Sequence, residues 1–144
     1  MECLEKGNKK ITDKDITGIA SEFCVLSMLL RIGADATLTL GNKKEVDIIV
    51  TKNGKALTID VKGLRSTGDF ILGNHENSFQ DKNHYFIFVH YTKFSDILSL
   101  PEFFVVPAVK ISNLIKERNG IKNISLKTLR ESYFYTEETL KVFL

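Results

Sequence analysis

The stretch KEVDIIVTKNGKALTIDVKG, residues 44–63, decides the fold of this chain. It consists of two short apolar segments on either side of Asn53-Gly54, the dipeptide that best favours a tight type I′ hairpin turn. If Asn53 and Gly54 form the loop, Lys52 faces Lys55, and the pairing of residues continues outward from there. The stretch therefore predicts an antiparallel hairpin with a defined register.

This register places Asp47 opposite Asp60 and Glu45 opposite Lys62 on one face of the hairpin, since side chains alternate along a strand. Like charges that face each other across a strand pair repel, and a cation usually offsets such a cost. Two carboxylates in this arrangement suit a hard ion such as Mg²⁺ or Mn²⁺. The alternative is a solvated sheet face with a Glu45–Lys62 ion pair. The other face is purely apolar: Val46, Ile48, Val50, Leu57, Ile59 and Val61.

A long helix precedes the hairpin. Thr12-x-x-Asp15 is typical of a capping box, and the helix it opens is expected to run to about Ile32, with Gly33 as its stop. Gly18 lies within this helix and would let it approach another backbone or a ligand closely.

Glu22 occupies an unusual position on this helix. At 100° per residue it falls near the middle of an apolar stripe that includes Leu26 and Leu29. A buried carboxylate needs a partner or a metal, although a glutamate at the edge of the core could also reach solvent or a lysine. If the helix covers the face that carries Asp47 and Asp60, Glu22 can point at both. One metal site would then explain all three carboxylates.

The remaining elements are predicted from shorter signals. Residues 34–40 should be a strand that completes a three-stranded antiparallel meander with the hairpin. The apolar run 85–91 is expected to be a central strand that is covered on both faces. The other expectations are a short strand at 70–72, a helical turn at 94–98, a strand at 103–106, an amphipathic helix at 112–118, and one or two helices within 125–144.

The order of these elements resembles the PD-(D/E)xK nuclease superfamily, which includes type II restriction enzymes and archaeal Holliday-junction resolvases. The matching residues are Glu22 on the helix, Asp47 in the first hairpin strand, and Asp60-x-Lys62 in the second. Val46 stands where the motif name has proline. The resemblance implies an α/β fold that is restriction-endonuclease-like, with a central mixed β-sheet that contains the antiparallel hairpin and is flanked by helices.

The same resemblance implies a metal-dependent endonuclease that hydrolyses phosphodiester bonds in DNA with Mg²⁺ or Mn²⁺. Asp47 and Asp60 would bind the metal, Glu22 would bind it or a second ion, and Lys62 would help to position or activate the attacking water. Some proteins with this fold have lost catalysis. A catalytically inactive module that binds nucleic acid or a protein partner is therefore the alternative, and a purely structural protein is a third possibility.

Residues 63–84 follow the second hairpin strand directly and could border the substrate. An ordinary surface loop explains this polar segment equally well. His75 and His84 could carry protons, but isolated histidines are more often surface or packing residues. The candidate phosphate contacts in this segment are Arg65, Ser66 and Thr67.

Bulk properties describe one ordinary globular domain spanning residues 1–144, with 1–11 as a loosely held arm. The chain is 43% hydrophobic and 26% charged, and its net charge of +2 is too small to indicate nucleic-acid binding by itself. Cys3 and Cys24 suggest neither a disulfide framework nor a zinc site. No signal peptide or membrane span is evident, so the expected location is cytoplasmic. A homodimer would suit an enzyme that cuts both strands.

Overall fold

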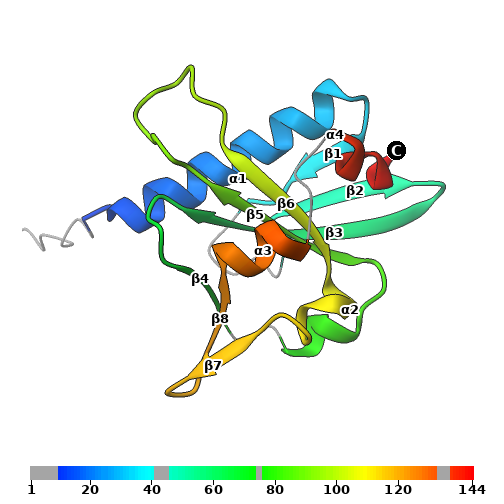
Figure 1. Ribbon diagram of the computed structural model, residues 1–144. Coiled ribbons are helices and arrows are strands. Elements are labelled where there is room, and N and C mark those ends of the chain that lie inside the picture. The colour runs from blue at the N-terminus through cyan, green and yellow to red at the C-terminus, as the bar shows by residue number, and fades with distance from the viewer. Residues whose placement is uncertain (1–9, 41–45, 74–75, 133–136) are drawn as a thin grey trace, which may run out of the picture.

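A computed structural model describes residues 10–40, 46–73, 76–132 and 137–144 (Figure 1). The strands in these ranges are β1 (Asp35–Leu38), β2 (Ile48–Lys52), β3 (Lys55–Leu64), β4 (Asp69–Leu72), β5 (His84–His90), β6 (Glu102–Pro107), β7 (Lys116–Arg118) and β8 (Ile121–Ser125). The helices are α1 (Asp13–Arg31), α2 (Ala108–Ile111), α3 (Leu126–Ser132) and α4 (Glu137–Leu140), with 3-10 helices η1 (Glu76–Gln80) and η2 (Lys141–Phe143). The strands form two sheets in these ranges, with the orders β1-β2-β3-β5-β6 and β4-β8-β7.

The predicted hairpin is confirmed, with its register. Asn53 and Gly54 have φ values of 51° and 74°, which is the left-handed backbone that a type I′ turn requires. The pairing of β2 with β3 runs from Lys52 opposite Lys55 to Ile48 opposite Ile59. β1 pairs antiparallel with β2 and completes the predicted meander.

β5 makes the large sheet mixed, because it pairs parallel with β3 and antiparallel with β6. Its side chains alternate between two apolar cores: Ile87 and Val89 lie in one, and Phe86 and Phe88 in the other. The prediction of a strand that is covered on both faces is therefore confirmed.

α1 covers the apolar face of the hairpin. The predicted capping box is present, since Asp15 N–H donates to Thr12 Oγ1 at 3.2 Å, and Gly33 follows the helix with a φ of 94°. Val25 and Leu29 of α1 share a buried core with Ile59 and the other apolar residues that β2 and β3 present on that face.

The position predicted for Glu22 on this helix is wrong. The buried residues of α1 are Thr17, Ser21, Val25 and Leu29, and Glu22 is only half-buried beside this stripe. Ile19 and Phe23, two apolar residues near Glu22 on this helix, are 51% and 55% exposed. The helix has this rotation about its axis because Val25 and Leu29 pack on the apolar face of the hairpin.

The opposite face of the large sheet is covered by the small sheet together with α2 and α3 (Figure 1). Phe86, Phe88 and Phe104 from the large sheet meet Phe70 from β4 and Ile124 from β8 in this second core. Phe70 and Phe88 pack edge to face with ring centroids 5.1 Å apart, and Phe86 and Phe88 are stacked with centroids 6.2 Å apart.

The helix predicted at 112–118 is wrong. After α2, the chain forms β7 and turns at Asn119 and Gly120, whose φ values of 52° and 75° again fit a type I′ turn. β7 then pairs with β8. In place of one helical turn at 94–98 the chain makes two successive turns, in which Asp96 N–H donates to Lys93 O and Ser99 N–H donates to Asp96 O. The prediction of helices within 125–144 is confirmed by α3 and α4.

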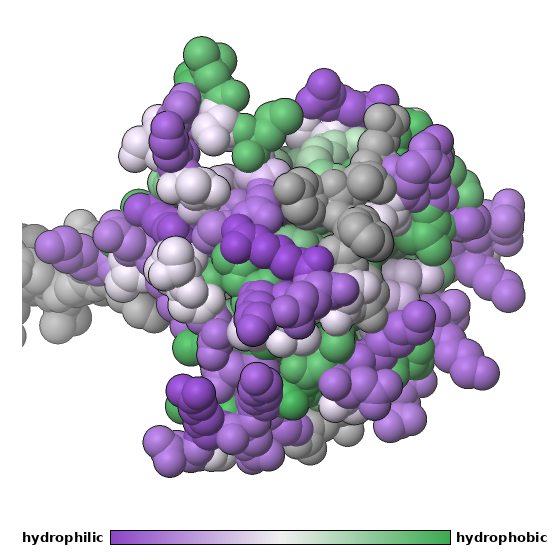
Figure 2. Space-filling view, viewed as in Figure 1, coloured by the Kyte–Doolittle hydropathy of each residue, from purple (hydrophilic) through white to green (hydrophobic). Residues whose placement is uncertain are grey.

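Within the described ranges, no helix is long and apolar enough to cross a bilayer. The loop between β5 and β6 projects from the molecule and carries apolar side chains at its tip (Figure 2). Ile97, Leu98 and Leu100 on this loop are 93%, 89% and 90% exposed.

Candidate functional site

Asp47 lies where β2 parts from β3. Its N–H donates to Ile59 O at 3.0 Å, although Ile59 is already paired with Ile48. Two residues on one strand therefore oppose one on the other, which is the arrangement of a β-bulge. The Asp47 carboxylate then accepts the Val61 N–H at 2.8 Å. Asp47 therefore does not directly face Asp60, as the regular register predicted. The bulge forms because the Asp47 carboxylate accepts the Val61 N–H in place of a backbone carbonyl.

Asp60 is buried, 4% exposed, and contacts a buried histidine on the neighbouring strand. His84 Nε2 lies 3.3 Å from Asp60 Oδ2, and His84 Nδ1 lies 2.7 Å from Thr58 Oγ1. A proton on Nε2 satisfies both contacts, because the Thr58 hydroxyl can then donate to Nδ1. His84 thus fixes the orientation of the Asp60 carboxylate.

Lys62 lines a groove with a volume of about 470 Å³ at the end of β3. One wall is the N-terminal half of α1, and the other is β4 and the residue that follows it. The lining residues are Lys14, Gly18, Val61, Lys62, Gly63, Leu64, Asp69, Phe70, Ile71 and Gly73.

Gly63 sets the distance between α1 and β3. A Cβ atom at this position would overlap Ser21 Oγ and lie 3.0 Å from the Thr17 carbonyl oxygen. Ser21 is itself held, because its hydroxyl donates to Thr17 O at 2.6 Å and lies 3.3 Å from the Tyr91 hydroxyl. Burial raises the pKa of Tyr91, so this phenol keeps its proton near neutral pH.

Cys24 lies on the same helix and is partly buried. Burial raises the pKa of its thiol above the ordinary value. It therefore stays a neutral thiol near neutral pH and has little nucleophilic character.

The predicted cluster of three carboxylates is not found. Among the residues described, no three His, Cys, Asp or Glu side chains lie close enough to hold one metal ion. Glu22 does not join the two aspartates because α1 packs on the apolar face of the hairpin. Asp60 lies on the opposite face, which it shares with Phe86. Metal binding by Glu22 stays a prediction, and Glu45 lies outside the described residues.

Arg65 follows β3 and contacts the start of α1. Its Nε donates to Thr17 Oγ1 at 2.6 Å, its Nη2 to Asp13 O at 3.4 Å, and its guanidinium carbon lies 3.7 Å from the centre of the Phe94 ring. These contacts tie the start of α1 to the end of β3. The predicted phosphate contacts of Arg65, Ser66 and Thr67 stay predictions, and His75 lies outside the described residues.

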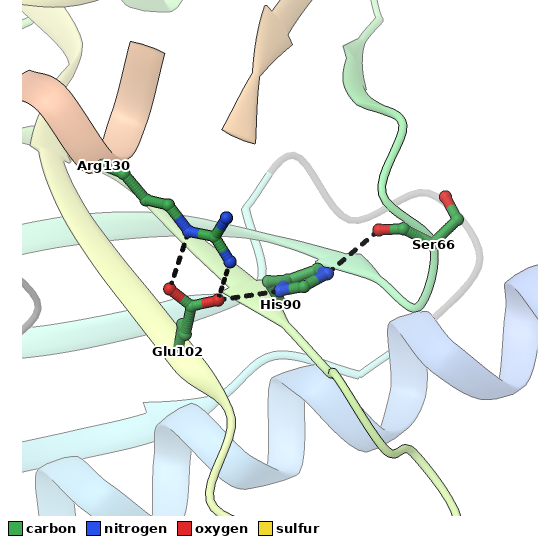
Figure 3. A network of polar contacts seen from close by, with 4 residues as sticks. All are labelled: Ser66, His90, Glu102 and Arg130. Atoms are coloured by element: carbon green, nitrogen blue, oxygen red, sulfur yellow. Dashed lines mark hydrogen bonds and ion pairs between the residues drawn. The ribbon is translucent and has the colours of Figure 1, made fainter. Parts of the chain in front are cut away.

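A polar network holds the segment that follows β3 (Figure 3). His90 is 4% exposed, and its Nε2 lies 3.0 Å from Ser66 O while its Nδ1 lies 3.0 Å from Glu102 Oε1. Arg130 of α3 donates to both oxygens of Glu102, from Nε at 3.0 Å and also from Nη2. The network thus joins β5, β6 and α3 to the chain leaving β3.

Acid is expected to weaken this network. The bond from Arg130, assisted by His90, holds the pKa of Glu102 below its ordinary value despite partial burial. The Glu102 carboxylate therefore stabilises the fold above that ordinary value, and the contribution is lost as pH falls through the lowered pKa. Glu102→Gln should cost about 1 kcal/mol at neutral pH, because Arg130 is half exposed and screened.

Urea unfolding at a series of pH values checks this prediction. The difference between wild type and Glu102→Gln should be constant near neutral pH and shrink in acid. A difference that is independent of pH would contradict it.

Asp47 and Asp60 are the two hairpin carboxylates that could hold a divalent metal. The Val61 bond brings the Asp47 carboxylate beside the peptide that follows Asp60, and His84 fixes the second carboxylate. Mg²⁺ is commonly held by one or two carboxylates, with water and phosphate oxygens as its other ligands. Two carboxylates are therefore enough for such an ion when water and phosphate complete its shell.

Two residues that line the groove, Lys14 and Asp69, were not predicted from the sequence. The signal for Lys14 was its position one turn before Gly18 on the same side of the helix. Asp69 joins the groove only because β4 lies against it. His84 was a candidate proton carrier, and its contact with Asp60 follows from the pairing of β3 with β5.

A solved resolvase structure has a similar architecture. The Holliday junction resolvase Hjc of Archaeoglobus fulgidus matches with a TM-score of 0.56 and 15% identity, over 86% of this chain and 95% of the resolvase. A bacterial homing endonuclease, I-Ssp6803I, matches with a TM-score of 0.49 and 19% identity, over 79% of this chain and 75% of that one. No family model and no curated protein sequence matches the chain.

The mixed sheet with its antiparallel hairpin, the covering helix and the similarity to the archaeal resolvase agree with one another. This chain has the restriction-endonuclease-like fold that the resolvase also has.

Proposed function

We propose that this protein is a divalent-metal-dependent nuclease that hydrolyses phosphodiester bonds in DNA. One observation carries the proposal: the bulge at Asp47 brings its carboxylate to the strand that bears Asp60 and Lys62, beside a groove. The similarity in fold to an archaeal protein named as a Holliday junction resolvase supports it.

Asp47 and Asp60 would hold the ion, which when bound supplies positive charge and lowers the pKa of water. The protein itself supplies the geometry. The Val61 N–H fixes the Asp47 carboxylate, and His84 fixes that of Asp60. The Lys62 ammonium orients the attacking water and stabilises negative charge that develops on the phosphate oxygens.

Purified protein should cleave duplex, single-stranded or branched DNA when Mg²⁺ or Mn²⁺ is present, and EDTA should stop the reaction. Protein that is inert on all three DNA forms with either ion would contradict the proposal. DNA binding without cleavage would favour the alternative, a catalytically inactive module that keeps the fold.

Metal binding can be tested without cleavage. Mn²⁺ should raise the melting temperature of wild type, since an ion that binds only the folded state adds about 2.7 kcal/mol at a concentration 100 times its Kd. Asp47→Asn should abolish this rise. The variant should still fold, because the amide oxygen can accept the Val61 N–H in place of the carboxylate.

Asp35→Asn is the matched control for this measurement, since Asp35 is exposed on β1 of the same sheet. It should keep the full rise with Mn²⁺. An equal rise in wild type and Asp47→Asn would place the ion elsewhere and contradict the assignment of Asp47.

A further inference from the structure

Gly18 is a glycine that the fold itself does not require. It lies inside α1, where glycine lowers helix stability relative to alanine. A Cβ atom at Gly18 would meet nothing within 4 Å, in contrast to Gly63, where α1 and β3 touch. The missing side chain therefore leaves open space and serves no contact within the protein.

That open space belongs to the groove beside Lys62. Gly18 and Lys14 stand one turn apart on the wall formed by α1, and both line the groove. The volume of about 470 Å³ lies within the range of about 300–1,000 Å³ that is typical of small-molecule sites.

The groove carries both positive charge and apolar surface. Lys14 and Lys62 bring positive charge to it, while Val61, Leu64 and Ile71 supply apolar surface. A phosphate suits the lysines, and the carbon face of a sugar suits the apolar surface. Asp69 on the β4 wall would repel a phosphate, which leaves the α1 side as the place for the anion.

We propose that this groove holds one sugar-phosphate unit of the DNA strand next to the cleaved bond, with its phosphate at Lys14 and its backbone against Gly18. The proposal deepens the proposed nuclease function, on which it rests. It predicts that residue 18 affects stability and DNA binding in opposite directions.

The test measures both properties for Gly18→Leu. Its melting temperature should rise by about 2–4 °C, because leucine favours helix and its Cβ would meet nothing within 4 Å. Its Kd for a fluorescein-labelled single-stranded DNA, measured by anisotropy in Ca²⁺, should rise at least about tenfold. Ser27→Ala is the matched control, since Ser27 is exposed on the far side of α1. It should raise the melting temperature without changing the Kd.

Lys14→Ala provides an independent measurement. Loss of one phosphate contact should reduce the slope of log K against log salt by about 0.7 for a single strand. Lys127→Ala, a lysine that is 84% exposed on α3, should leave the slope unchanged.

The outcomes separate the two proposals. If Gly18→Leu binds DNA as wild type does, or if Ser27→Ala weakens binding equally, the groove assignment is overturned. Wild type that binds no strand in Ca²⁺ overturns it as well. Cleavage by wild type in Mg²⁺ tests the nuclease function separately, so a normal Kd for Gly18→Leu in a cleaving enzyme refutes the groove alone.

Discussion

Asp60→Asn is expected to lower the rate of metal-dependent DNA cleavage by about 100- to 1,000-fold, the usual effect of removing one preorganised electrostatic group. The amide keeps the shape of the side chain and can retain the contact with His84. It removes the negative charge that would hold the ion. Initial rates in Mg²⁺ with saturating DNA measure the effect, and circular dichroism should confirm that the variant folds.

Lys62→Met should cause a loss of similar size, because methionine keeps the apolar stem and removes the ammonium. The matched controls are Asp35→Asn on β1 and Lys55→Met at the exposed start of β3. Both controls should cleave at the rate of wild type. If Asp60→Asn and Lys62→Met also cleave at that rate, the proposed catalytic roles are wrong.

Gly63→Ala should destabilise the protein by about 1–3 kcal/mol, the usual cost of forcing a methyl group into a packed interior. The new Cβ would overlap Ser21 Oγ and lie 3.0 Å from the Thr17 carbonyl oxygen. Ser21 cannot move aside easily, since it is fully buried and bonded to Thr17 O. Urea denaturation measures the loss.

Two variants sharpen this prediction. Gly68→Ala is the control, because its Cβ would meet only the Ser66 hydroxyl, at 3.3 Å, on an exposed segment. The double variant Ser21→Ala/Gly63→Ala should lose less than the sum of the single losses, since removing the hydroxyl relieves part of the overlap. Exact additivity would show that the two residues do not meet as described.

Features fixed by local chemistry were predictable from the sequence. The Asn53-Gly54 turn determines the hairpin and its register, and Thr12 with Asp15 determines where α1 begins. Asn119-Gly120 has the same turn chemistry as Asn53-Gly54, but it directly follows the segment 112–118 that was predicted to be a helix. The short strands on either side of it, three and five residues long, carried too little periodicity to correct that interpretation.

Features that depend on tertiary packing were not predictable. α1 also carries apolar side chains on its outer face, with Leu30 52% exposed as well as Ile19 and Phe23. Its periodicity therefore placed the centre of the apolar stripe near Glu22, whereas the buried residues of α1 are Thr17, Ser21, Val25 and Leu29. The bulge at Asp47 arises because a side chain competes with backbone for the Val61 N–H, and no spacing rule reveals such a competition.

The two-sided burial of β5 limits how this chain could be divided or recombined. Residues 13–64 contain every residue that matches the motif. Asp60, however, faces the second core, which includes Phe86 and Phe104 from the later part of the chain. An excised N-terminal segment would lack the surface that dehydrates this carboxylate and the histidine that orients it. A segment transferred to another protein would therefore need the residues of the second core as well as the motif to keep the environment of Asp60.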